Sequence, residues 1–220
     1  FIVADSHIQA IKIRLYPMEE QKDYISRLIG SCRYVYNACL SHKIEKYTLE
    51  KKNVSLAELG KFLTELKKKE DTKWLSDVHS KVLQQSIINL DIAYKSFFKN
   101  GMGFPRFKSK KKSKQSCRFP VDAIGGINGN RIDIITPLKN ILFKCSKKDE
   151  IRLNSLQESF KSGTLSISNS GNYYFSILAE IPTNLKKNVA DTKSTIGLDM
   201  GINDFIVDTK RNRKENLKLN

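Results

Sequence analysis

The interpretation of this chain depends on the stretch Thr195-Ile196-Gly197-Leu198-Asp199-Met200-Gly201-Ile202-Asn203-Asp204-Phe205. Its pattern predicts a short apolar strand that ends at Asp199, a sharp turn at Gly201 and a second strand over residues 205–207. A carboxylate at the end of a strand is well placed to bind a divalent metal ion. Asp199 is therefore our candidate catalytic and metal-binding residue.

Two other interpretations of Asp199 stay open on this stretch alone. Aspartate is common where a strand ends, because its side chain can bond the backbone two residues further on, so an ordinary turn residue is one alternative. The other is functional, since an Asp-x-Gly after an apolar strand also opens the phosphate-binding loop of actin-like and sugar-kinase ATPases. What precedes the stretch has to decide between the three.

The composition is strongly basic. The 220 residues include 39 Lys and Arg against 23 Asp and Glu, a formal net charge of +16. Such an excess attracts polyanions, most often nucleic acid, although lysine-rich surfaces also serve solubility. No apolar run approaches the roughly 20 residues that a membrane span requires. We therefore expect a soluble, cytoplasmic protein that binds nucleic acid.

The cysteines and histidines show no metal-binding pattern. The four cysteines never form a Cys-x-x-Cys pair and the three histidines are scattered, which predicts reduced thiols and neither a disulfide framework nor a zinc site. Cys32 and Cys39 are seven residues apart, the spacing of two core residues on one helix. The start, Phe1-Ile2-Val3-Ala4-Asp5, has no initiator Met and no secretory-signal pattern, so we expect a sequence clipped at its front.

One strand and a set of helices are predicted before residue 100. Residues 11–15 alternate apolar and basic, which places Lys12 and Arg14 on the outer face of a strand that Pro17 ends. The helical pattern then predicts one helix to about Gly30 and a second over residues 32–47. A third begins at the capping box formed by residues 55–58, and a fourth covers about 77–99. Residues 17–100 should form a helical bundle.

The segment 99–118 is basic and contains no acidic residue. It has eight Lys and Arg residues and two phenylalanines, Phe104 and Phe107. Basic charge neutralises phosphates and aromatic rings stack on bases, so we expect a nucleic-acid-binding loop; the alternative is a solvated linker. The candidate phosphate-binding residues are Lys12, Arg14, Arg106, Lys108, Lys110, Lys111, Lys112, Lys114 and Arg118, and the candidate stacking residues are Phe104 and Phe107.

From residue 116 onward the pattern is one of strands and turns. Asn-Gly-rich segments at 127–132 and 168–173 predict two hairpins. The strands around them suggest a small antiparallel barrel or a bent sheet, and the early strand 11–15 should pair with this set. A polar, lysine-bearing linker then leads into the acidic stretch.

Several sequence fragments together resemble the N-terminal half of the TnpB family, the OrfB-type proteins of bacterial insertion sequences and relatives of type V CRISPR nucleases. Each fragment is short, but their order and spacing are specific, and they cover nearly the whole chain. They are Arg14-Leu15-Tyr16-Pro17, Arg33-Tyr34-Val35-Tyr36-Asn37, Leu63-Thr64-Glu65-Leu66-Lys67, Trp74-Leu75, Leu83-Gln84-Gln85-Ser86, Asn89-Leu90-Asp91, Tyr94-Lys95-Ser96-Phe97-Phe98, Gly103-Phe104-Pro105-Arg106-Phe107-Lys108 and Gly197-Leu198-Asp199-Met200-Gly201-Ile202.

The resemblance implies an α+β fold and an RNA-guided DNA endonuclease. Its split oligonucleotide-binding-like β-barrel would carry an inserted helical bundle and be followed by the first strands of a ribonuclease H-like (RuvC) domain. The implied parts are a first barrel strand (7–16) and a helix-turn-helix-like recognition lobe (17–100). The basic loop with the rest of the barrel (101–182), a linker (183–194) and the start of the nuclease domain (195–220) follow.

The resemblance also implies roles for individual residues. Asp199 matches the first RuvC carboxylate, a Mg²⁺ ligand. Ser80, Lys81 and Gln84 match positions that face the short DNA motif beside the target, and Gln84 suits an adenine edge best, because its amide can form two hydrogen bonds there. Leu56 stands where relatives often have an aromatic contact. The implied partners are guide RNA and target DNA, in a nucleoid-associated protein of a bacterial mobile element.

The further carboxylates and the four-cysteine zinc finger of such nucleases lie far downstream of the motifs matched here. Cleavage with two metal ions needs several carboxylates around ions about 4 Å apart, so we expect an incomplete piece that does not cleave, with Mg²⁺ bound weakly or not at all. The alternatives are a naturally shortened, non-cleaving RNA-guided DNA-binding regulator and, in a different class, the actin-like ATPase.

Overall fold

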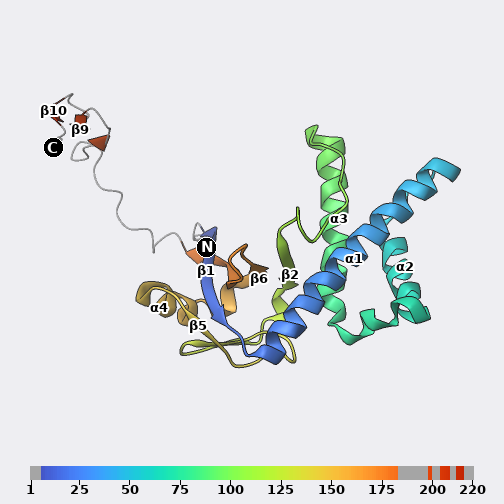
Figure 1. Cartoon of the computed structure of the whole chain (residues 1–220), viewed down its shortest axis with the longest axis horizontal. Coiled ribbons are helices and arrows are strands. Elements are labelled where there is room, and N and C mark those ends of the chain that lie inside the picture. Colours follow the sequence, from blue (N-terminus) through green and yellow to red (C-terminus); the bar gives the residue numbers. More distant parts are fainter. Residues whose placement is uncertain (1–5, 183–197, 200–203, 209–211, 216–220) are drawn as a thin grey trace, which may run out of the picture. The chain divides into compact units, whose positions relative to one another are not determined.

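The computed structural model describes residues 6–182, 198–199, 204–208 and 212–215 (Figure 1). They belong to two compact units, one of residues Ser6–Ile181 and one that includes Pro182–Asn220. The predicted linker 183–194 lies outside the described residues. In the described residues, no helix is both long and apolar enough to cross a membrane.

The larger unit combines helices with one seven-stranded sheet, so it belongs to the α+β class. The sheet order β2-β6-β7-β1-β5-β4-β3 leaves β2 and β3 at its edges. The elements are β1 (Ser6–Tyr16), α1 (Glu19–Glu50), α2 (Leu56–Lys68), the 3₁₀ helix η1 (Glu70–Asp77), α3 (Ser80–Asn100), β2 (Gln115–Pro120), η2 (Val121–Ala123), β3 (Gly126–Asn128), β4 (Arg131–Asp133), β5 (Ile141–Lys144), α4 (Lys147–Ser155), η3 (Gln157–Ser159), β6 (Phe160–Ile167) and β7 (Tyr173–Pro182).

Strand β1 confirms the alternation seen in the sequence. Ile11, Ile13 and Leu15 are buried, while Lys12 and Arg14 on the opposite face are exposed. The strand lies between β7 and β5, although both follow it by more than 120 residues. The predicted pairing of the first strand with the later set is therefore confirmed. Burying one face of β1 against distant strands ties the two ends of this unit together.

Helix α1 is a single helix of 32 residues, so the predicted end near Gly30 is wrong. Its buried stripe continues past Gly30 at helical spacing through Cys32, Val35 and Cys39. A glycine inside a helix costs only about 1 kcal/mol, which the packing of a continuous apolar stripe outweighs. Cys32 and Cys39 are buried as their spacing predicts. The helix ends at Lys51, whose φ is 53°.

The predictions for α2 and α3 are largely confirmed. Ser55 accepts a hydrogen bond from the Glu58 amide, and the Glu58 carboxylate bonds back to Ser55, so the capping box is present. On α2, Leu59, Leu63 and Leu66 are buried, but Leu56 is 43% exposed rather than inward. Helix α3 begins at residue 80 instead of 77 because η1 occupies the preceding residues, and α1 and α3 pack side by side (Figure 1).

Both predicted hairpins form in the sheet. The β3–β4 turn contains Gly129 at φ 57° and the β6–β7 turn contains Gly171 at φ 76°, the left-handed region that glycine enters at little cost. The edge strand β2, the helix α4 and the three 3₁₀ helices η1, η2 and η3 are absent from the predictions. Helix α4 buries only Leu153 among its residues, which explains why no apolar stripe marked it.

The second unit includes a three-stranded antiparallel sheet of β8 (Leu198–Asp199), β9 (Asp204–Asp208) and β10 (Arg213–Glu215), in the order β10-β9-β8. Asp199 is the last residue of β8 and pairs with Val207 of β9. The prediction of one strand ending at Asp199 and another beginning shortly after it is therefore confirmed, whereas the predicted turn at Gly201 lies outside the described residues.

Candidate nucleic-acid interface

The basic segment is bonded to helix α1. The side-chain amide of Asn37 donates a hydrogen bond to the Lys108 carbonyl at 2.8 Å and accepts one from the Lys108 amide at 2.8 Å. Two parallel bonds fix both the position and the direction of the backbone. The segment therefore runs along a rigid helix at Lys108, which disfavours the solvated-linker alternative.

A second set of bonds shapes the lysine-rich turn. The Gln115 amide donates to the carbonyls of Lys110 (2.7 Å) and Ser113 (3.0 Å) and accepts a bond from Arg33 of α1 at 3.0 Å. Ser109 closes the turn, because its hydroxyl accepts a bond from the Lys112 amide. The side chains of Lys110, Lys111 and Lys112 project from this turn and are exposed. Three lysines on an ordered turn suit the contact with phosphates that the sequence predicts.

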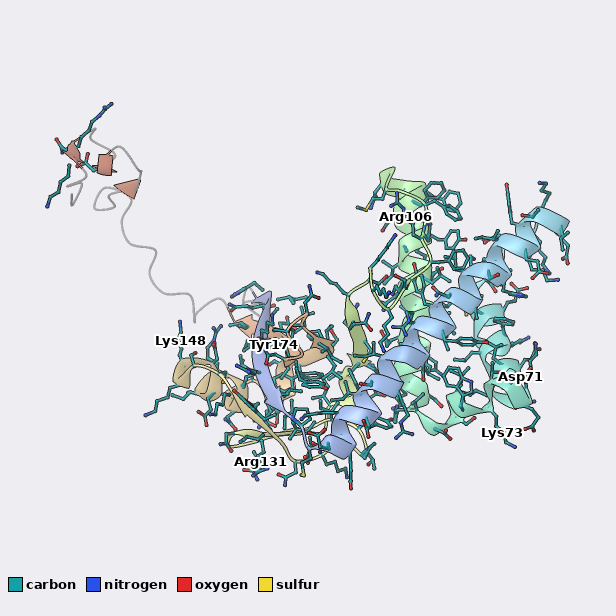
Figure 2. All side chains as sticks on the ribbon, viewed as in Figure 1. Asp71, Lys73, Arg106, Arg131, Lys148 and Tyr174 are labelled. Carbon is teal, nitrogen blue, oxygen red and sulfur yellow. The ribbon has the colours of Figure 1, made fainter. Side chains whose placement is uncertain are left out.

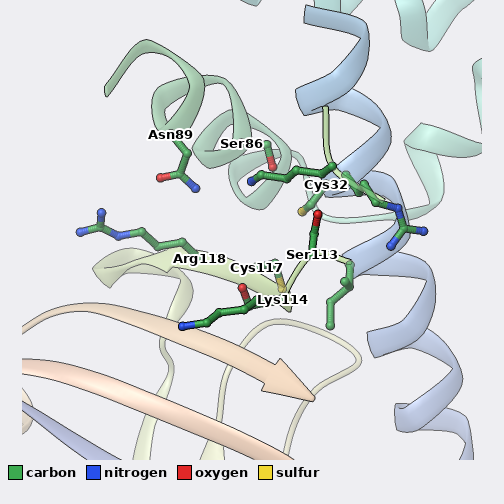
Figure 3. Close-up of a pocket in the computed structure, with 11 residues that line it drawn as sticks. Cys32, Ser86, Asn89, Ser113, Lys114, Cys117 and Arg118 are labelled. Atoms are coloured by element: carbon green, nitrogen blue, oxygen red, sulfur yellow. The ribbon is translucent and has the colours of Figure 1, made fainter. Parts of the chain in front are cut away.

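Four cations surround a small cavity where α1, α3, the basic segment and β2 meet (Figure 3). Arg33 comes from α1, Lys108 and Lys114 from the basic segment and Arg118 from β2, while α3 contributes Ser86 and Asn89. The cavity volume is about 20 Å³, enough for one water-sized group. None of its lining residues is acidic. We call this group of side chains the basic cavity.

The electrostatics of the basic cavity favour an anion. Burial lowers the pKa of the Lys108 ammonium, because partial removal from water penalises its charge. Its Nζ lies 3.9 Å from the centre of the Tyr36 ring, a cation–π contact that only partly replaces water. Arg118 donates one bond of 3.3 Å, to the Ser162 hydroxyl. A phosphate oxygen entering the cavity would meet several donors and no opposing carboxylate.

The outer face of β1 forms a second basic surface. The Lys12 ammonium lies 4.2 Å from the centre of the Tyr174 ring on β7. The Arg14 guanidinium lies 5.2 Å from the Tyr16 ring and donates a 2.7 Å hydrogen bond to Asn172 in the β6–β7 turn. Cations fixed beside aromatic rings are suited to a nucleic-acid strand, since they offer charge and stacking surface together.

The three residues predicted to face target-adjacent DNA lie in the first turns of α3 and are exposed. Ser80 accepts a 2.6 Å hydrogen bond from Lys67, and Lys81 forms an ion pair with Asp122. The amide of Gln84 has no hydrogen-bond partner in residues 6–182, which leaves both of its polar atoms open to a base edge. Of the three, Gln84 is therefore the best prepared to read a base.

Releasing Lys81 from its acidic partner should strengthen DNA binding. Asp122 forms an ion pair with Lys81, and the hydrogen bond from Lys81 lowers the pKa of its carboxyl. We expect Asp122→Asn to raise the affinity for duplex DNA about 1.5- to 5-fold, the range of an exposed ion pair, in a fluorescence-anisotropy titration. The control is Glu180→Gln, which frees Lys161 on the sheet from a similar 2.6 Å pair. Equal gains in both variants would contradict a special position of Lys81.

The predicted stacking residues are both accessible, Phe104 at 46% and Phe107 at 57% exposure. Phe104 meets the rings of Tyr94 and Phe97 edge to face, at 5.5 and 5.4 Å between centroids. Tyr94 and Phe97 fit the apolar stripe of the fourth predicted helix, which predicts burial, whereas both are only partly buried. The burial of Lys43, which is only 8% exposed, was not predicted from the sequence either. A lysine at the edge of a helical stripe gives no sign in sequence of such burial.

The described residues of the small unit offer only part of a metal site. Asp199 stands at the strand end that the sequence predicts, and Asp208 is engaged at the β9–β10 turn, where its carboxylate accepts bonds from the backbone (2.8 Å) and side chain (2.7 Å) of Asn212. Within the described part of the chain, no group of three or more His, Cys, Asp or Glu residues could hold a metal ion.

Comparison with known proteins yields one family profile, HTH_OrfB_IS605, described as a helix-turn-helix domain, which matches residues 7–52. In this chain the matched residues form β1 and the single long helix α1. The part that the profile covers therefore includes the outward-facing Lys12 and Arg14 as well as Arg33 and Asn37.

Two curated relatives share the name "Putative RNA-guided DNA endonuclease". One, from Streptomyces pristinaespiralis, is 31% identical over 201 residues, or 90% of this chain and 47% of the relative. The other, InsQ of Escherichia coli (strain K12), is 32% identical over 197 residues, or 89% of this chain and 46% of the relative. The chain thus spans about half the length of these two relatives.

A third relative is the virulence protein VsdF of Salmonella dublin. It is 32% identical over 114 residues, which cover 47% of this chain and 94% of VsdF. Together with the OrfB profile and the two relatives that match about nine-tenths of the sequence, this agreement confirms the resemblance. The chain belongs to the TnpB family of OrfB-type insertion-sequence proteins.

Proposed function

We propose that the chain is the nucleic-acid-binding part of an RNA-guided DNA endonuclease of TnpB type, with guide RNA and target-adjacent DNA as its ligands. Two relatives carry the name RNA-guided DNA endonuclease, which supports RNA and DNA as the ligands. The observation that carries the proposal is the basic cavity, which is lined by four cationic residues, one from α1 and three from residues 108–118, and by no acidic residue. A solubility surface would not require cations to be brought together around an enclosed space.

The proposed roles follow from the geometry. The basic cavity and the turn at 109–113 hold phosphates and so position the strand without reading its sequence. The outer face of β1 offers a further path for the backbone through Lys12 and Arg14. Gln84, which is exposed on α3 and has no hydrogen-bond partner in residues 6–182, reads a base edge. In this proposal the seven-stranded sheet is the oligonucleotide-binding-like wedge and β8–β10 begin the RuvC-like domain.

The dependence of binding on salt tests the proposal. We expect the logarithm of the association constant to fall linearly with the logarithm of salt concentration, by about 0.9 per phosphate contact on duplex DNA and about 0.7 on a single strand. The slope is measured by titrating the chain with single-stranded RNA and with duplex DNA at several salt concentrations, from about 50 to about 300 mM. A slope near zero for both ligands would contradict the proposal.

The prediction of a metal site depends on one residue, Asp199. Cleavage with two metal ions requires several carboxylates around ions about 4 Å apart. Asp199 is one candidate ligand, and the described residues do not complete a donor set around it. We therefore assign no cleavage step to these residues, and we propose Asp199 only as one Mg²⁺ ligand of the family's nuclease centre.

A second candidate function is a non-cleaving, RNA-guided DNA-binding regulator. The observation that favours considering it is VsdF, a relative that matches this chain over 94% of its own length and so consists almost entirely of shared sequence. Because neither candidate predicts cleavage by this chain alone, incubation of the full-length protein with guide RNA, target DNA and Mg²⁺ separates the two candidates. Cleavage that is lost in Asp199→Ala would favour the endonuclease, and tight binding without cleavage would favour the regulator.

A further inference from the structure

A second pocket lies at the far ends of α1 and α3, apart from the basic cavity. Its volume is about 440 Å³, within the range of about 300–1,000 Å³ that is typical of ligand sites. Five aromatic side chains dominate its lining, and the remaining lining residues come from the end of α1 and the turn after it. The aromatic residues are Tyr47, Tyr94, Phe97 and Phe98, joined by Phe104 from the basic segment. We call it the aromatic pocket.

The rings of the aromatic pocket are held in place yet accessible. Tyr94 stacks on Phe98 at 6.4 Å between centroids, and Phe97 meets Phe98 and Phe104 edge to face at 5.0 and 5.4 Å. Phe98 is 75% exposed and Tyr47 is 59% exposed. Side chains of this size are rarely left in water by a fold that could bury them, so the exposed rings mark a binding surface.

Polar groups converge on the same pocket. Lys43 donates hydrogen bonds to the Asn53 side-chain oxygen at 3.1 Å and to the Val54 carbonyl, and its Nζ lies 4.9 Å from the centre of the Tyr94 ring. One of its three N–H groups therefore has no hydrogen-bond acceptor in residues 6–182. Burial lowers the pKa of this ammonium. The amide nitrogen of Asn53 likewise has both donors open within that range. An apolar space with a few fixed donors suits a flat ligand that carries acceptor atoms at its edge.

The charge around the aromatic pocket selects the ligand class. Lys43 and Lys52 line it, no lining residue is acidic, and the Lys51 ammonium lies 5.5 Å from the Tyr47 ring at its rim. Glu58 approaches Lys52 only at 3.6 Å. Arg106 follows Phe104 by two residues and lies beside the C-terminal half of α3 (Figure 2). An apolar peptide would need none of these cations, whereas a base attached to a phosphate backbone uses both rings and charge.

We propose that the aromatic pocket takes one unstacked base of a single-stranded nucleic acid, with the flanking phosphates on the lysines at its rim. The inference rests on the proposed function, because it names a contact of the same nucleic-acid ligand. The base would stack on Phe98 or Tyr47 and accept hydrogen bonds from Lys43 and Asn53 at its carbonyl or ring-nitrogen edge. Any base can stack on the aromatic rings, whereas the hydrogen-bond donors of Lys43 and Asn53 favour bases that present acceptor atoms at their edge.

The test compares a single-stranded oligonucleotide with an abasic oligonucleotide of the same length and phosphate number. We expect the chain to bind the base-containing strand more tightly, by about 5- to 150-fold, as stacking on one aromatic side chain supplies. Phe98→Ala and Tyr47→Ala should each remove much of this preference and leave the salt slope unchanged. A 2-aminopurine base in the strand should lose fluorescence on binding to the unaltered chain and less so in the variants.

The control is Ile151→Ala, which shortens a side chain of similar exposure (65%) on α4. Because Phe98 and Tyr47 are mostly exposed, neither variant should alter folding. Unchanged preference for the base-containing strand in both variants would overturn the inference while leaving the proposed function intact. A dimer in sedimentation equilibrium that Phe98→Ala abolishes without changing strand affinity would overturn it as well. Absence of any salt-dependent binding by the unaltered chain would instead contradict the proposed function.

Discussion

Exchanging Lys114 and Arg118 together for glutamine is expected to weaken binding of single-stranded RNA by about 10- to 100-fold at 150 mM salt, roughly physiological strength. Both side chains line the basic cavity, where no lining carboxylate offsets their charge. If each contacts one phosphate, the slope of log affinity against log salt should become shallower by about 1.4, twice the value of about 0.7 for one contact on a single strand. The measurement is a salt series of anisotropy titrations.

The matched control removes the same charge elsewhere. Lys147 and Lys148 are exposed at the start of α4, where Figure 2 labels Lys148, and neither lines the basic cavity. Their joint change to glutamine should alter the affinity only through the general field, by a factor well below that of the cavity pair. Equal losses in the two double variants would show that net charge alone binds the strand. The melting temperature of each variant verifies that the fold is kept.

The largest expected effect on stability comes from Gly163→Ala in β6. A Cβ atom at this position would lie 2.2 Å from the Phe175 ring of β7, which is fully buried and meets Phe119 at 5.7 Å between centroids. Because the ring has no free space to move into, the added methyl should cost about 1–3 kcal/mol. For a domain of this size that corresponds to a fall in melting temperature of roughly 2–12 °C.

Gly60→Ala on α2 is the matched comparison, since a Cβ there would meet nothing within 4 Å. Replacing a glycine inside an exposed helix should stabilise the protein by about 0.5–1 kcal/mol. The two substitutions add the same methyl group and should act in opposite directions in a thermal melt. A Gly163→Ala variant as stable as the unaltered chain would show that the sheet core can rearrange around Phe175.

Much of the fold could be predicted because local patterns agreed with the final packing. The alternation in β1, the capping box at Ser55 and the glycines of the two hairpins each follow from a local rule of backbone geometry or burial. Helix α1 shows the limit, because its continuation through Gly30 depends on packing against α3, which no local pattern records. Strand β2 was overlooked for a similar reason, since the basic residues of its segment hid the alternating burial of Cys117 and Phe119.

The candidate site was predictable in its charge and not in its geometry. The basic segment was evident from composition, but its attachment through Asn37 and the joining of Arg33 to Gln115 depend on contacts between residues more than 70 positions apart. The aromatic pocket was missed because Tyr94 and Phe97 fit a helical core stripe equally well. These two residues lie near the end of α3, where no further element of residues 6–182 covers the apolar stripe, and they are therefore only partly buried.

A structure of the chain bound to single-stranded RNA would show where the strand lies relative to the basic cavity. We expect a phosphate oxygen about 3 Å from the side-chain nitrogens of Lys114 and Arg118. A bound strand that leaves this cavity open to water and contacts only other surfaces would contradict this expectation.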